Sequence, residues 1–210
     1  MKKASLVCLA IILFASITNA QITKGSIFIG GQISGSTYKQ ENSGSNIQKQ
    51  SSFVFSPAIG TAIRQNLIAG IDLTYAHSKF EYLTSPGNEG NSFGGGVFLR
   101  RYASISNRFY FFLQGRIGYY HDKSESTSGG VKYQNTSNNF NLGVYPGVSF
   151  ALSKCLYVEA GLNNLALLNY SHGTVTQTGS GDQTTNSFGF STSANGSNLS
   201  FALRFIIPKK

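Results

Sequence analysis

Three histidines are the obvious candidates for acid–base chemistry in this chain: His77, His121 and His172. His77 precedes Ser78 and lies close to Glu81, so it has the residue types of a hydrolase triad around it. Serine is so frequent in the chain that such neighbours carry little weight. The spacing of the three histidines matches no zinc motif. We therefore expect no catalytic residue, no metal site and no other cofactor.

A second group of chemically active side chains consists of charges that interrupt apolar segments. They are Asp72, Arg100, Arg116, Glu159 and Arg204. In each segment, large apolar residues alternate with small or polar ones, and the charge lies among the small and polar set. These charges would meet inside a closed sheet, where an unpaired charge is very costly. We expect a salt-bridged lumen in which Gln114, Tyr110 and Tyr145 fill the gaps; a charged gate or a catalytic carboxylate pair is the alternative.

The segments that carry these charges are expected to be β-strands, because apolar residues recur at every second position. Their predicted ranges are 26–36, 52–63, 67–79, 92–103, 109–120, 139–151, 155–163 and 198–207. Residues 165–168 could extend the seventh strand and 186–192 the eighth, but 164–183 is predicted to be mostly loop. Pro57 lacks an N–H group, so a bulge or a displaced register is expected there.

Connector lengths alternate along the chain. Long polar loops follow the odd-numbered strands, and short turns are predicted at 64–66, 104–108 and 152–154. Large apolar side chains facing lipid around a polar lumen indicate an all-β fold, an eight-stranded antiparallel up-and-down transmembrane β-barrel. A soluble lipocalin-like carrier would hold those apolar side chains inside. Eight strands are barely wide enough for their own side chains, so we expect no sugar-sized pore.

The first twenty residues have the pattern of a secretory signal peptide. Two lysines precede an apolar run over residues 6–17, which is shorter than the ~20 residues of a transmembrane helix. Cleavage after Ala20 would leave one barrel domain at 21–210. Lysine and arginine number 17 against 8 acidic residues, but they are scattered without a basic stripe. We therefore expect no nucleic-acid partner, and instead contact with membrane lipid and lipopolysaccharide.

Tyrosines gather near the predicted outer ends of the strands: Tyr38, Tyr75, Tyr82, Tyr119, Tyr120, Tyr133 and Tyr170. We predict that they form an aromatic girdle at the membrane interface, since the chain has no Trp. For the tyrosines that lie in loops, a carbohydrate-binding platform is the alternative.

Four short motifs, in order, give the chain a family resemblance. They are residues 24–31 (KGSIFIGG), 55–60 (FSPAIG) followed by 66–70 (NLIAG), 98–102 (FLRRY) and 187–190 (SFGF). With these, the chain resembles the outer membrane protein beta-barrel domain family, the small barrels of OmpA, OmpX and OmpW type. The resemblance implies a Gram-negative cell envelope, an outer-membrane location and assembly by the barrel-insertion machinery. One departure is the end of the chain, Phe205 to Lys210, where such barrels usually end on an aromatic residue.

The resemblance implies no single activity, since its members are structural proteins, adhesins, small-solute channels or secretion accessories. From the residues, we expect a structural or surface-interaction barrel with a largely closed lumen and an unidentified surface ligand. A narrow porin-like channel for small or amphipathic solutes is the alternative. A lipid-modifying outer-membrane enzyme is a third, which would need a histidine beside a serine and an acid.

Overall fold

The computed structural model describes residues 22–41, 47–82, 87–128, 130–162, 165–177, 179–192 and 199–209. The predicted signal peptide lies outside these residues. The strands are β1 (Ile27–Glu41), β2 (Ile47–Arg64), β3 (Leu67–Tyr82), β4 (Asn88–Ser104), β5 (Phe109–Ser128), β6 (Val131–Ala151), β7 (Leu156–Leu162), β8 (Ala166–Gln177), β9 (Gln183–Thr192) and β10 (Leu199–Ile207). No helix in the described residues is long and apolar enough to span a membrane.

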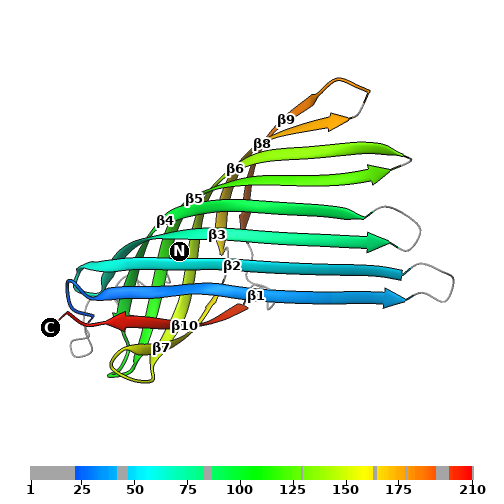
Figure 1. Ribbon diagram of the computed structural model, residues 1–210. Coiled ribbons are helices and arrows are strands. Elements are labelled where there is room, and N and C mark those ends of the chain that lie inside the picture. Colours follow the sequence, from blue (N-terminus) through cyan, green and yellow to red (C-terminus); the bar gives the residue numbers. More distant parts are fainter. Residues whose placement is uncertain are drawn as a thin grey trace, which may run out of the picture.

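Eight of these strands close into an antiparallel up-and-down barrel (Figure 1). The ring runs from β1 through β2, β3, β4, β5, β6, β7 and β10 back to β1. Strand β8 continues the line of β7 along β6, because β6 pairs with β7 at Gly147–Ala151 and with β8 at Tyr133–Val144. Strand β9 then pairs with β8. The predicted eight-stranded barrel is therefore confirmed.

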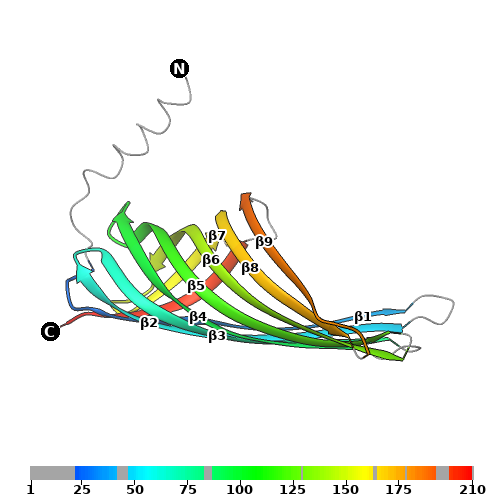
Figure 2. The same cartoon turned by 90° about the horizontal axis from the view of Figure 1, so that it is seen from above.

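The strands reach further than their apolar pattern predicts. Strand β5 continues to Ser128 and β6 begins at Val131, where the sequence indicates a long loop. Residues 166–177 form a paired strand, so the prediction of mostly loop over 164–183 is wrong. The outer parts of these strands, beyond Tyr120 on β5 and beyond Tyr170 on β8, are mostly polar on both faces. A strand without an apolar face leaves no period-2 signal in the sequence. Figure 2 shows these outer parts as long hairpins that extend beyond the closed ring. We call this the hairpin end, and the opposite end, which holds the short connections, the turn end.

The wall is joined unevenly. Strand β1 pairs with β2 along its whole length, but with β10 only at Ile27, Phe28 and Ile29. Within the described residues, no pairing connects β9 to β1, and the two strands lie apart in Figure 1. One line of the barrel wall is therefore closed only near the turn end.

The turn end is filled by a buried aromatic and aliphatic cluster. Its members are Ile22, Phe28, Ala62, Ile68, Phe98, Tyr102, Tyr110, Phe112, Tyr157 and Ile206. The N-terminal segment is tied to this end because Asn66 accepts a hydrogen bond from the amide of Ile22 through Oδ1 at 2.8 Å. Asn66 adopts a positive φ of 58°, a conformation that asparagine tolerates in tight turns. The barrel therefore has a packed floor above which the charged residues lie.

Pro57 is accommodated without a change of register. Phe55 pairs with Tyr75 and Ala58 with Asp72, so the alignment of β2 and β3 is the same on both sides of the proline. The expected bulge is absent there, and the register of β2 and β3 shifts instead between Ala62 and Arg64. The hydroxyl of Ser56 donates to the carbonyl of Leu73 at 2.9 Å, which replaces a ladder bond that Pro57 cannot make.

Replacing Ser56 with alanine should therefore lower the free energy of unfolding by about 1 kcal/mol, because the Leu73 carbonyl loses its donor. Denaturant titration of the folded barrel, followed by its gel mobility, measures this difference. Ser36→Ala is the matched control, since its hydroxyl bonds only another exposed serine side chain, at 2.8 Å. Equal losses in the two variants would show that the Ser56 bond does not compensate for the proline.

Candidate functional site

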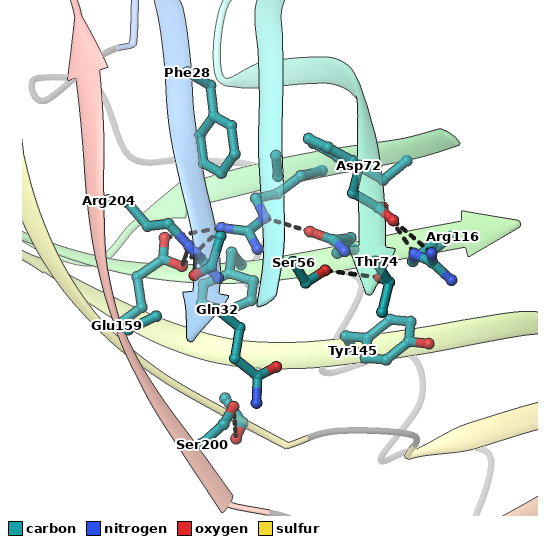
Figure 3. A pocket seen from close by; sticks show the side chains of 18 of the residues that line it. Phe28, Gln32, Ser56, Asp72, Thr74, Arg116, Tyr145, Glu159, Ser200 and Arg204 are labelled. Carbon is teal, nitrogen blue, oxygen red and sulfur yellow. Dashed lines mark hydrogen bonds and ion pairs between the residues drawn. The ribbon is translucent and has the colours of Figure 1, made fainter. Parts of the chain in front are cut away.

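The lumen above the aromatic floor holds a cavity of about 350 Å³ (Figure 3). Side chains from both halves of the ring line it, because the small and polar set of every strand points inward. All five charges expected in the lumen line this cavity. The structure joins them in two groups, one around Glu159 and one around Asp72.

Glu159 on β7 is the centre of the lower group. Its carboxylate is 3% exposed and accepts from Arg100 Nη1 at 3.0 and 2.7 Å. The hydroxyl of Tyr102 donates to the same carboxylate at 2.8 Å, and Arg204 Nε donates at 3.2 Å. Arg100 also donates from Nε to Gln114 at 2.8 Å. One carboxylate therefore holds two guanidinium groups from β4 and β10 against the wall of β7.

Arg100 is held from the other side by aromatic rings. Its guanidinium carbon lies 4.5 Å from the centre of the Phe112 ring and 5.1 Å from that of Phe28. Such cation–π contacts gain strength when they are desolvated. The lower group is thereby continuous with the aromatic floor, which explains why Arg100 is only 5% exposed.

Arg204 joins the lower group to the weakly paired line of the wall. Its Nη1 donates to the carbonyl oxygen of Gly31 on β1 at 2.5 Å. Gly31 lies just above the last residue of β1 that pairs with β10. A side chain thus supplies a donor to a strand edge at the place where the ladder between β1 and β10 stops.

Asp72 and Arg116 form the upper group. Arg116 donates to both carboxylate oxygens of Asp72, from Nε at 2.8 Å and from Nη2 at 2.5 Å. The guanidinium carbon lies 5.2 Å from the centre of the Tyr120 ring. Space for it comes from Gly96, where a Cβ atom would approach the guanidinium to 2.8 Å. A glycine-lined niche with a bidentate partner fixes the arginine across the lumen.

These contacts leave both carboxylates engaged by guanidinium groups. Glu159 and Asp72 lie in separate ion groups, so the structure does not assemble them as a carboxylate pair. Of the predicted gap fillers, Gln114 and Tyr145 line the cavity and Tyr110 lies in the floor. The arrangement can brace the wall and narrow the lumen, and it carries one positive charge in excess.

The predicted girdle of tyrosines is only partly on the outer surface. Tyr75, Tyr119 and Tyr170 share the face of the outward apolar residues. Tyr120 lines the cavity, so its assignment to the girdle is wrong. Tyr38 and Tyr133 also occupy inward register positions, which corrects their assignment. Position near a strand end does not decide the face, because neighbouring residues point to opposite sides. The side chain of Tyr82 lies outside the described residues.

The residues of the catalytic alternative at His77 do not come together as a triad. The ring Nδ1 of His77 lies 2.9 Å from Oδ1 of Asn91, Glu81 is bridged to Lys79 at 2.6 Å, and Ser78 lies on the other parity of β3. His121 and His172 make the same type of contact with Asn138 and Asn186. No group of three metal-binding side chains occurs in the part of the chain that the structure describes. Sequence reasoning missed these three partners, although each strand pair carries Tyr-x-His facing Asn-x-Phe.

Comparisons with known proteins assign the chain to no family. No protein-family model and no curated protein sequence matches the chain. Among solved structures, it is similar to the translocator domain of the autotransporter NalP from Neisseria meningitidis, with a TM-score of 0.41 and 11% sequence identity over 98% of this chain and 93% of that chain. The fold is a β-barrel that eight antiparallel strands close, and its lumen is polar and ion-paired.

Proposed function

We propose that this protein is an integral barrel of the bacterial outer membrane with a structural or surface-interaction role and a lumen held closed by its ion pairs. The observation that carries the proposal is the difference between the outer face of the barrel wall, which is apolar, and its inner face, which is polar. Large apolar side chains cover the outside, and Ile33, Leu73, Phe93, Phe188 and Phe201 are 60–75% exposed. Such a surface suits hydrocarbon and would aggregate in water.

Two features support a closed lumen. The aromatic floor blocks the turn end, and every lumen charge has a partner of opposite sign. The hairpins at the opposite end supply polar surface for contacts outside the membrane. The proposed role is non-enzymatic, because the described histidines bond asparagine and not a carboxylate.

The unheated and boiled outer-membrane fractions should differ in gel mobility, because folded membrane barrels resist detergent until they are heated. N-terminal sequencing of that protein should begin at Gln21 if the signal peptide is cleaved as predicted. A protein recovered in the soluble fraction without a mobility shift would contradict the membrane location.

A narrow channel is the second candidate, favoured by one observation. The cavity of about 350 Å³ is bordered by three arginines and two carboxylates, which would favour small anions. Recordings from planar bilayers separate the two candidates. A closed barrel gives no steps of current, whereas steady anion-selective steps in the unmodified protein would favour the channel.

A further inference from the structure

Three structurally equivalent units recur on the outer face of the barrel. In each, a Tyr-x-His segment on one strand pairs with an Asn-x-Phe segment on the next. We call them the histidine collar, which comprises Tyr75, His77 and Asn91; Tyr119, His121 and Asn138; and Tyr170, His172 and Asn186. The Nδ1 to Oδ1 distances are 2.9, 2.9 and 2.7 Å, and the corresponding tyrosine hydroxyls lie 3.3, 2.7 and 3.3 Å from the same oxygens.

The hydrogen bonds of the collar set the tautomer of each ring. The amide oxygen of asparagine can only accept, so the hydrogen of the imidazole must be on Nδ1. The tyrosine donates to the same oxygen and holds the amide in place. Nε2 is thereby left as the ring atom able to meet a further ligand, as an acceptor when neutral and as a donor when protonated.

The collar lies where the apolar surface ends. The ring of Tyr75 packs on Phe93 at 4.8 Å, and the ring of Tyr119 on Phe140 at 4.9 Å. One step further toward the turn end the outward positions are apolar, as at Leu73. Toward the hairpin end they become charged on β3 and β5, at Lys79 and Lys123, and polar on β8, at Thr174. In a membrane barrel this boundary is where lipid headgroups lie, so the three histidines would face them.

The first unit lies beside a hollow. A surface cavity of about 240 Å³ is lined by residues 35–37 of β1, 51–53 of β2 and His77. The lining contains glycine, serine and threonine, which leave room and bring hydroxyl groups, and Phe53, which is 42% exposed and extends the apolar surface. A polar hollow next to an apolar surface fits a lipid headgroup with its chains lying on the barrel wall.

Lysines and glutamates occupy the outward positions beyond the hollow. Lys79 lies two residues beyond His77, opposite Ser51 of β2. Lys49 on β2 and Lys39 on β1 are paired positions at the next level, and Glu81 and Glu89 are the acidic groups that face this set. The hydrogen bond with Glu81 raises the pKa of Lys79 above its usual value, so this lysine stays charged at neutral pH. Glu41, two residues beyond Lys39 on β1, is a third acidic position on this face. Lysines and glutamates are thus equal in number beyond the hollow, so the protonation of His77 supplies the net positive charge there.

We propose that the hollow beside His77 binds the phosphate group of an outer-leaflet lipid headgroup, and that His77 Nε2 is its pH-dependent ligand. This inference rests on the membrane location proposed above. A proton on Nε2 converts the ring from an acceptor into a cationic donor, so phosphate binding strengthens as the pH falls through the range in which histidines titrate. His172 has partners of the same type but does not line this hollow. Its register neighbours on β6 and β9, Asn138 and Asn186, are uncharged.

The test uses the full mature chain folded in uncharged maltoside micelles. The probe is short-chain phosphatidylglycerol, because its phosphodiester keeps one negative charge at both pH values. Binding is followed by titration calorimetry at pH 8 and pH 5.5. We expect the dissociation constant to fall by roughly fivefold at the lower pH, the effect of one favourable ion pair of about 1 kcal/mol. His77→Gln should abolish this gain, and the matched variant His172→Gln should keep it.

Two results would overturn the proposal. The first concerns the gain in lipid affinity at low pH: the proposal is wrong if His77→Gln keeps this gain, or if His172→Gln loses it to the same extent. The other is displacement of the probe by inorganic phosphate at equal concentration, which would make the hollow a site for free anions. Heat-dependent gel mobility is measured for every variant. If the unmodified protein keeps its mobility shift but does not bind the lipid, the lipid site alone is contradicted. If the unmodified protein shows no shift, the proposed membrane barrel is contradicted.

Discussion

Replacing Glu159 with alanine should lower the free energy of unfolding of the barrel by about 3–5 kcal/mol, because the substitution leaves uncompensated buried charge. Glu159 is the acceptor for Arg100, Tyr102 and Arg204 at distances of 2.7–3.2 Å. Without it, two guanidinium groups would face each other next to the aromatic floor. Urea unfolding in micelles, followed by the mobility shift, measures the loss.

Glu159→Gln is the control for shape. The amide retains one oxygen that can accept from Arg100, but it removes the negative charge, so we expect a smaller loss than for alanine. Arg100→Ala should also destabilise the barrel, since it removes two charge-assisted bonds to Glu159 and the contact with Phe112. A Glu159→Ala protein with unchanged stability and a raised conductance would show that this group is a gate and not a brace.

The position of Glu159 could be predicted because β-strands have only two faces. Alternation of large and small residues placed the charges inside, and the closure of eight strands made them neighbours. Which acid meets which arginine could not be predicted. That choice depends on the stagger of the strands, which brings β7 across the lumen from β4, and on glycines that make room for long side chains.

The errors of the sequence interpretation have two causes. Apolar alternation disappears where the outer face of a strand becomes polar, as in β8 beyond Tyr170. Tyr120 was instead assigned by its place at a strand end, although Tyr119 beside it already occupied the outer face. The Tyr–His–Asn units are visible in sequence only as two short motifs on different strands, and register is needed to join them.

Removal of the upper ion pair should leave the lumen closed. Asp72→Ala and Arg116→Ala each leave one buried charge without its partner. Each substitution should therefore lower the free energy of unfolding by about 3 kcal/mol or more. The double variant should lose less free energy of unfolding than the two single variants lose together. It removes both members of a bidentate pair and so leaves no charge unpaired. Denaturant titration of the four proteins measures this coupling.

The order of the layers along the barrel predicts the conductance of that double variant. On β4 and β5 the facing inward pairs run from Phe98 and Arg116, through Arg100 and Gln114, to Tyr102 and Phe112. An ion that passes the emptied upper layer would still meet the Arg100–Glu159–Arg204 group and then the aromatic floor. We therefore expect no current steps in planar bilayers from Asp72→Ala/Arg116→Ala. Steps in this variant but not in the unmodified protein would place the seal at the upper pair, and the lower group would then be a support for the wall alone.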